Sequence, residues 1–111
     1  MTANEYQQLA LRTANPRLTI TAQLINGLLG IAGEGGEAAD ILKKHLYQDH
    51  PLDQQHLAKE LGDLCWYIAL TASAIGYDLD HILESNIKKL EARYPDGFDP
   101  TRSMNREEDD V

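Results

Sequence analysis

Apolar residues recur at intervals of three, four and seven positions along most of the chain, and no segment alternates strictly between apolar and polar residues. One stripe, between about positions 21 and 46, consists of Leu24, Leu28, Ile31, Ala38 and Leu42. A second, between positions 54 and 75, consists of Leu57, Leu61, Leu64, Ile68 and Ala72. This period is that of an amphipathic helix, whereas a half-buried strand has a period of two. The pattern predicts an all-α protein with these residues in its core.

Proline, glycine and capping residues divide the chain into four predicted helices. Their ranges are residues 4–14, 21–46, 54–75 and 81–94. Pro16 and Pro95 follow the first and last helices, and Gly76 closes the third. Asp53 is the expected N-cap of the third helix, and Asp78 or Asp80 that of the fourth.

The length of the chain limits how large a core it can build. A protein of 111 residues fits one domain, which we expect to span residues 1–106, followed by a loose, solvated acidic tail at residues 107–111. Four helices of this size bury little apolar surface on their own. We therefore expect a four-helix bundle that is completed by oligomerisation.

Charge and cysteine content exclude several classes of protein. The formal net charge is −8, which disfavours binding along a nucleic-acid backbone, although single nucleotides can still be bound through cations. Cys65 is the only cysteine, so no intrachain disulfide can form.

No apolar run approaches the roughly 20 residues of a membrane span, and the first residues do not resemble a secretion signal. We expect a cytoplasmic protein that binds neither membranes nor nucleic acid.

Two acidic pairs stand on the predicted second and third helices. Glu34 and Glu37 are three residues apart, as are Glu60 and Asp63, so each pair lies on one side of its helix. None of the four has a lysine or arginine three or four residues further on, although Lys59 could reach Asp63. Asp40, by contrast, is followed by Lys43 and Lys44 and fits an ordinary solvated helix face.

Unpaired carboxylates on two antiparallel helices permit two interpretations. Either they form a solvated acidic face, or they converge on a hard cation such as Mg²⁺ or Mn²⁺. A di-iron site is less favoured, because its helices carry Glu-x-x-His motifs. Gly33, Gly35 and Gly36 allow close approach, either by a packed helix or by a ligand.

Aromatic and histidine residues add little. Trp66 is expected to pack in the core rather than to stack on a base. The four histidines, His45, His50, His56 and His81, show no paired ligand spacing and are expected at the surface or at caps.

Three features occur in a specific order along the chain: the first acidic pair with the glycines around it, the second acidic pair, and the segment "NIKKLEARYPDGF" at 86–98. In this order the chain resembles the MazG-like all-α nucleoside triphosphate pyrophosphohydrolases. The resemblance runs from about Tyr6 to Arg106. It implies a bundle completed by a partner subunit, as a homodimer or homotetramer. It also implies hydrolysis of nucleoside triphosphates between the α- and β-phosphates, to a monophosphate and pyrophosphate.

The resemblance further assigns roles to individual residues. The four carboxylates, Glu34, Glu37, Glu60 and Asp63, would be catalytic and would hold Mg²⁺. Asn86, Lys89 and Arg93, on one stripe of the last helix, would bind the substrate phosphates, although cations near a helix C-terminus are also favoured by the helix dipole. Some family members carry a further glutamate where this chain has Gly33. A non-catalytic nucleotide-binding module and a purely structural dimerising bundle remain the alternatives.

Overall fold

The computed structural model describes residues 1–111 and contains helices but no β-strand. The helices are α1 (Ala3–Leu11), α2 (Ile20–Tyr47), α3 (Gln54–Ala74), α4 (Leu79–Arg93) and α5 (Pro100–Met104). The all-α prediction is confirmed, and α1 to α4 end within about three residues of the predicted ranges. α5 was not predicted. It starts because the Asp99 side chain accepts a hydrogen bond from the Thr101 N–H and Pro100 occupies the first turn.

Side-chain caps account for most helix starts. Thr2 and Thr19 cap α1 and α2, and the predicted cap Asp53 accepts a hydrogen bond from the His56 N–H at 3.0 Å. Asp78 occupies the N-cap position of α4 without a side-chain hydrogen bond. Gly76 has a φ of +79°, which turns the chain after α3 as predicted.

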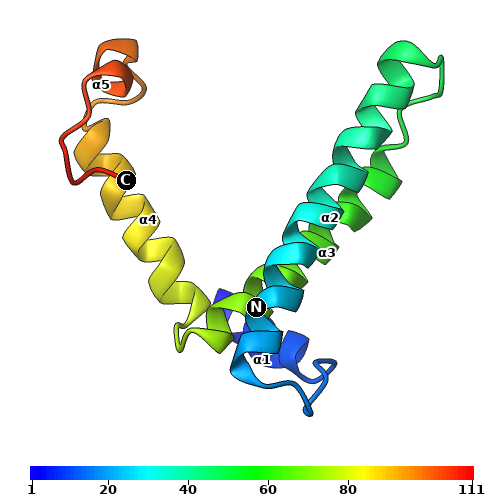
Figure 1. The fold of residues 1–111 in the computed structure, drawn as a ribbon. Helices are drawn as coiled ribbons and strands as arrows, with labels where there is room; N and C mark the ends of the chain where they lie inside the picture. Colours follow the sequence, from blue (N-terminus) through cyan, green and yellow to red (C-terminus); the bar gives the residue numbers. More distant parts are fainter.

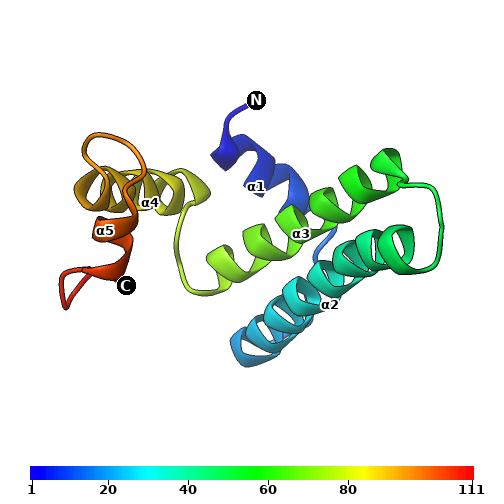
Figure 2. The same ribbon diagram turned by 90° about the horizontal axis from the view of Figure 1, so that it is seen from above.

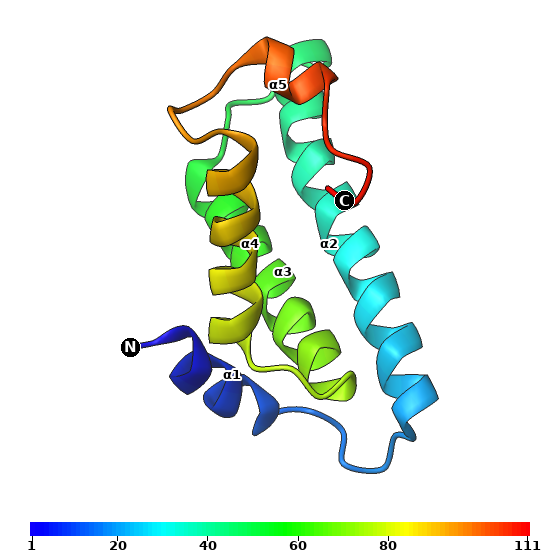
Figure 3. The same ribbon diagram turned by 90° about the vertical axis from the view of Figure 1, so that its left-hand side faces the viewer.

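The helices form an open V rather than a closed bundle (Figure 1). One arm is the antiparallel pair α2 and α3, which is the main packed pair of the chain. The other arm is α4 with α5 and the C-terminus. α1 lies where the two arms meet and packs against both α3 and α4 (Figure 2). The arms overlap in the view of Figure 3, but Figure 1 shows the space between them.

A small hydrophobic cluster and the hydrogen bonds of one buried glutamine hold α1 at this junction. The buried Gln7 amide donates to the carbonyls of Ala69 and Tyr77 and accepts from the Leu79 N–H. Trp66 packs against the core, and its Nε1 donates to the Ala10 carbonyl at 3.0 Å, so its expected packing role is confirmed. Gln7 ties α1 to the end of α3 and the start of α4 because a buried amide must satisfy its donors and acceptor.

The core of one chain is much smaller than the sequence predicted. Only 8 of 111 residues are buried, and the radius of gyration is 17.1 Å, whereas a compact domain of this length would have about 13 Å. The predicted core positions that are exposed instead are Leu28, Leu42, Leu61 and Ile68 on α2 and α3. These predictions are wrong for the single chain because nothing covers the outward face of the α2–α3 pair. Ile87 on α4 is exposed as well. Oligomerisation stays a prediction.

Glycines let α2 and α3 approach at one end of the pair only. A Cβ at Gly27 would clash with Thr71, and one at Gly30 would clash with the Tyr67 ring. By contrast, Gly33, Gly35 and Gly36 have nothing within 4 Å of a Cβ position. Within one chain, therefore, these three glycines do not serve helix packing.

The acidic tail is not free. Asp110 pairs with Arg93 of α4, and only 13% of its side chain is exposed. Lys89 donates to the main-chain carbonyl of Val111 at 2.6 Å. The end of the chain thus folds back on α4, because Arg93 and Lys89 donate hydrogen bonds to its carboxylate and carbonyl oxygens.

Candidate active site

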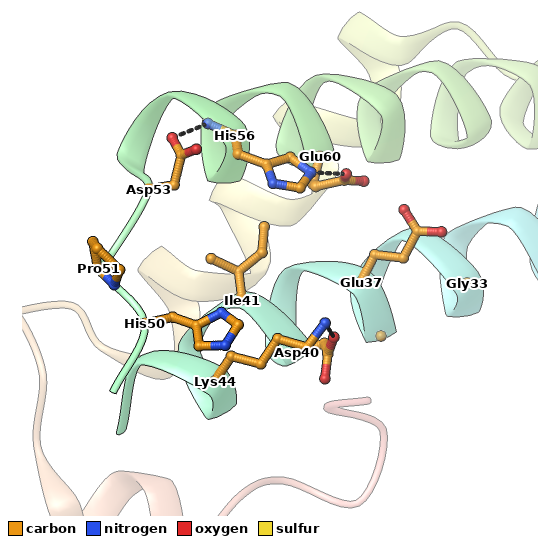
Figure 4. A pocket seen from close by; sticks show the side chains of 11 residues that line it. Gly33, Glu37, Asp40, Ile41, Lys44, His50, Pro51, Asp53, His56 and Glu60 are labelled. Atoms are coloured by element: carbon orange, nitrogen blue, oxygen red, sulfur yellow. Dashed lines mark hydrogen bonds and ion pairs between the residues drawn. The ribbon is translucent and has the colours of Figure 1, made fainter. Parts of the chain in front are cut away.

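Three of the four predicted carboxylates meet between α2 and α3. Oxygens of Glu34 and Glu37, one helical turn apart on α2, lie within 4.8 Å of each other and of a Glu60 oxygen on α3. Figure 4 shows Glu37 and Glu60 facing one another across the space between the helices. We call these three residues the carboxylate cluster. The antiparallel pairing supplies the convergence, since residues 26 positions apart in sequence come to the same level of the pair.

The fourth predicted carboxylate, Asp63, stands apart. Asp63 is exposed and does not belong to the group that offers converging oxygens. Its negative charge nevertheless raises the pKa of Glu34, although less than the nearer groups do. Aspartate is one methylene shorter than glutamate, so the carboxylate of Asp63 stays closer to its own helix.

Two oxygens of the cluster are buried without a partner. These are Glu34 Oε2 and Glu60 Oε2, neither of which accepts a hydrogen bond from any group in the chain. The Glu60 side chain is only 10% exposed. A buried carboxylate oxygen without a donor is costly unless a cation is bound. The cluster therefore fits a hard, oxygen-loving cation.

The electrostatics of the cluster also indicate a missing positive charge. A hydrogen bond to Glu60, followed by desolvation and the charge of Glu37, raises the pKa of Glu34 to about 7. The hydrogen bond from protonated Glu34 lowers the pKa of Glu60, helped by Glu37 and His56. Each carboxyl therefore shifts the pKa of the other, and the two titrate together.

Lysine and arginine do not neutralise the cluster. Asp40 forms ion pairs with Lys43 and Lys44 at 3.0 and 2.8 Å, as the sequence predicted. No lysine or arginine pairs with a cluster carboxylate, and Lys59 forms no ion pair with Asp63. The interpretation as an ordinary solvated face therefore fails for the buried Glu34 and Glu60 oxygens.

His56 is a contact that sequence reasoning missed. Its Nε2 lies 2.9 Å from Glu60 Oε1, and because ionised Glu60 can only accept, Nε2 carries the proton and donates. This bond holds one Glu60 oxygen and leaves the other for the cluster. The i, i+4 spacing of His56 and Glu60 was the available signal.

A cavity of about 850 Å³ opens beside the cluster. Its walls are the C-terminal half of α2, the loop that follows and the first turns of α3 (Figure 4). Gly33 and Gly36 line it together with Glu37 and Glu60. Because these glycines face the cavity and no packed helix, they leave room for a ligand beside the carboxylates.

The predicted phosphate-binding residues lie on the other arm. Asn86 and Lys89 border a separate depression on α4, and Arg93 is engaged by Asp110. α4 packs on α1 rather than alongside the α2–α3 pair (Figure 1). One chain therefore does not bring Asn86, Lys89 and Arg93 to the carboxylate cluster.

None of the helices combines the length and apolar character that crossing a bilayer requires.

The chain has relatives among known proteins. The chain is 36% identical over 69 residues to the Gene 37 protein of Mycobacterium phage L5, a match that covers 59% of this chain and 60% of the phage protein. No solved structure matches the chain significantly. A family model described as the MazG nucleotide pyrophosphohydrolase domain matches residues 24–98, which include every cluster residue and most of the cavity wall. The chain therefore belongs to the MazG nucleotide pyrophosphohydrolase domain family.

Proposed function

We propose that the protein hydrolyses nucleoside or deoxynucleoside triphosphates between the α- and β-phosphates. Water attacks the α-phosphorus, the bond to the bridging oxygen breaks, and a nucleoside monophosphate and pyrophosphate leave. The observation that carries the proposal is the pair of buried, unpartnered oxygens of Glu34 and Glu60 beside a cavity of about 850 Å³. Membership of a nucleotide pyrophosphohydrolase family supports the reaction type.

The carboxylate cluster, with Asp63 at its edge, is the proposed site for Mg²⁺, with Mn²⁺ as a substitute. When bound, such an ion neutralises phosphate charge and lowers the pKa of a bound water. The chain's own residues supply the rest of the chemistry. A cluster carboxylate that is not fully occupied by the cation accepts the proton that water loses, and His56 keeps Glu60 oriented toward the cluster.

Substrate binding in this proposal needs a second copy of the chain. The α2–α3 pair leaves large apolar side chains exposed, among them Leu28, Leu29 and Leu61. A homodimer or homotetramer that covers this surface would place the α4 arm of one copy near the cluster of another. Asn86, Lys89 and Arg93 would then contact the phosphates. We further propose a cytoplasmic location, with residues 1–106 as the catalytic domain and residues 107–111 as an acidic tail.

The decisive experiment is a panel of standard and modified nucleoside triphosphates incubated with Mg²⁺ in ¹⁸O-labelled water. Pyrophosphate should be released, and the label should appear in the nucleoside monophosphate. Label in pyrophosphate would mean attack at the β-phosphorus, and release of orthophosphate with a diphosphate product would contradict the proposal. Binding without turnover across the panel would favour the non-catalytic module instead.

A further inference from the structure

A second cavity lies between α4 and the C-terminal segment, and it concentrates the positive charge of an acidic protein. Its volume is about 270 Å³. Four of the ten lysines and arginines of the chain line it, namely Lys89, Arg93, Arg102 and Arg106. Three acidic residues of the tail, namely Glu107, Asp109 and Asp110, also line it, together with Ala92 and Asn105. We call this space the cationic cavity.

The contact of Asp110 with Arg93 has the geometry of anion recognition. Arg93 Nε donates to Asp110 Oδ2 at 2.7 Å, and Nη2 donates to Oδ1 at 2.6 Å. The Arg93 side chain is only 9% exposed, and that of Asp110 13%, so the pair is shielded from water. The guanidinium fork binds a carboxylate and a phosphate in the same bidentate manner. Asp110 thus presents to Arg93 the same pair of acceptor oxygens that a phosphate group would.

The tail forms hydrogen bonds with more than one cationic side chain of the cavity. Lys89 Nζ donates to the Val111 carbonyl at 2.6 Å. The hydrogen bond and charge of Arg93 lower the pKa of Asp110, and Arg106 and Lys89 add to the effect. Asp110 is therefore ionised at neutral pH and competes as an anion for the groups that an incoming phosphate would use.

Little else holds the tail in place. After α5, the backbone makes one turn hydrogen bond, from the Asp110 N–H to the Glu107 carbonyl, and no further helix. A segment held mainly by the Arg93–Asp110 ion pair and the hydrogen bond from Lys89 to Val111 can be released when a more highly charged ligand replaces these contacts.

We propose that Asp110 is an intramolecular competitor for a diphosphate or longer phosphate chain at the cationic cavity, where the proposed function already assigns Lys89 and Arg93 to phosphate binding. A phosphate chain binds by displacing the carboxylate of Asp110 from Arg93 and the Val111 carbonyl from Lys89. Assigning that chain to a nucleotide substrate rests on the proposed function. The competition between tail and phosphate does not.

The test is calorimetric titration of the full chain with inorganic pyrophosphate in buffer that contains EDTA. Asp110→Asn removes the competing charge and should bind pyrophosphate about tenfold more tightly than the unmodified chain, the scale of one lost charge-assisted hydrogen bond. Glu108→Gln is the matched control, since it removes one tail charge that does not line the cavity. Equal affinities for Asp110→Asn and Glu108→Gln would overturn the proposal.

A second measurement uses the unmodified chain and does not depend on any variant. The Arg93 Nε–H resonance should shift as pyrophosphate displaces Asp110, in proportion to the bound fraction. An Arg93 resonance that does not respond at saturating pyrophosphate would overturn the proposal.

Hydrolysis assays separate this proposal from the proposed function. If triphosphates are hydrolysed, Asp110→Asn should lower KM, whereas Glu108→Gln should leave KM unchanged. Normal hydrolysis with no change in KM or pyrophosphate affinity refutes the competition alone. Tighter pyrophosphate binding by Asp110→Asn in a protein that hydrolyses no triphosphate refutes the proposed function and supports the competition.

Discussion

Glu34 and Glu60 show how two carboxylates on different helices affect one another. The proximity of Glu60 and Glu37 raises the pKa of Glu34, and Glu34 and Glu60 each keep one oxygen buried without a partner. A cation between them would satisfy both oxygens. At the scale of single residues, the site is therefore arranged for a positive charge that the chain itself does not supply.

Removing one ligand should abolish turnover and leave the fold intact. Glu60→Gln keeps the shape of the side chain but loses the negative charge, so we expect hydrolysis to fall by about two orders of magnitude or more, the scale of a lost acid–base group. Turnover with Mg²⁺ and circular dichroism are the measurements. Glu91→Gln, an exposed glutamate of α4, is the control and should retain full activity. Near-normal turnover by Glu60→Gln would exclude the cluster as the site.

The raised pKa of Glu34 should make the stability of the metal-free protein depend on pH. The pKa of Glu34 is raised in the folded state from 4.5 to about 7. Between these values the folded chain binds more protons than the unfolded chain, so its stability should fall as pH rises from about 4.5 to 7. The lowered pKa of Glu60 acts only below 4.5. Urea unfolding midpoints in EDTA at a series of pH values would measure the effect.

The control for this pH dependence is Glu34→Gln. Its amide keeps a donor toward Glu60 without a titrating proton, so the decline between pH 4.5 and 7 should flatten. An equal decline in Glu34→Gln would assign the effect to another group.

At the scale of elements, α2 has two functions along its length. Its first half carries glycines that admit Thr71 and Tyr67 of α3, and its second half carries glycines that face open space. Close packing in the first half holds the helices in register. The open second half leaves room for a ligand beside Glu37.

Alanine substitutions should separate these functions. Gly30→Ala places a methyl group in the Tyr67 ring, and despite the better helix propensity of alanine it should destabilise the fold by about 1–3 kcal/mol. Gly35→Ala, with no neighbour to meet, should stabilise it by about 0.5–1 kcal/mol. Chemical unfolding of both variants is the measurement. Equal effects would mean that α2 and α3 do not pack closely at Gly30.

The whole molecule is open, and its exposed apolar surface is unusual for a monomer. Large apolar side chains on α2, α3 and α4 are about half exposed, while one chain buries only 8 of its 111 residues. Such surface is typical of protein interfaces. The V shape also leaves the cations of α4 away from the carboxylate cluster (Figure 1). Both features are explained if a second copy packs into the V.

Leu61→Ala tests this assembly. Leu61 is 51% exposed in the single chain, so an isolated chain should lose about 1 kcal/mol or less. If a second copy buries Leu61, the loss should be about 2–5 kcal/mol, and the unfolding midpoint should depend on protein concentration. Light scattering should give the mass of a dimer or tetramer that Leu61→Ala shifts toward monomer. A monodisperse monomer over the whole concentration range would contradict oligomerisation.

The helices could be predicted from the sequence because their signals are local. Apolar period, proline, glycine and caps act within about four residues, and they located α1 to α4, the Asp53 cap and the turn at Gly76. The same period placed Glu34 and Glu37 on one side of α2, and the absence of nearby lysines distinguished them from Asp40. The family resemblance could also be found from the sequence, because it rests on the order of short motifs along the chain.

Contacts between distant residues were decided only by the tertiary structure. The pairing of α2 with α3 brought Glu60 to Glu34 and left Asp63 outside the cluster. Periodicity identifies the apolar face of a helix but not what covers it, so Leu61 was predicted as core and is half exposed. The pairing of Arg93 with Asp110 spans 17 residues and a reversal of the chain. Such a contact depends on the path of the chain between the two residues. A local sequence pattern does not determine that path.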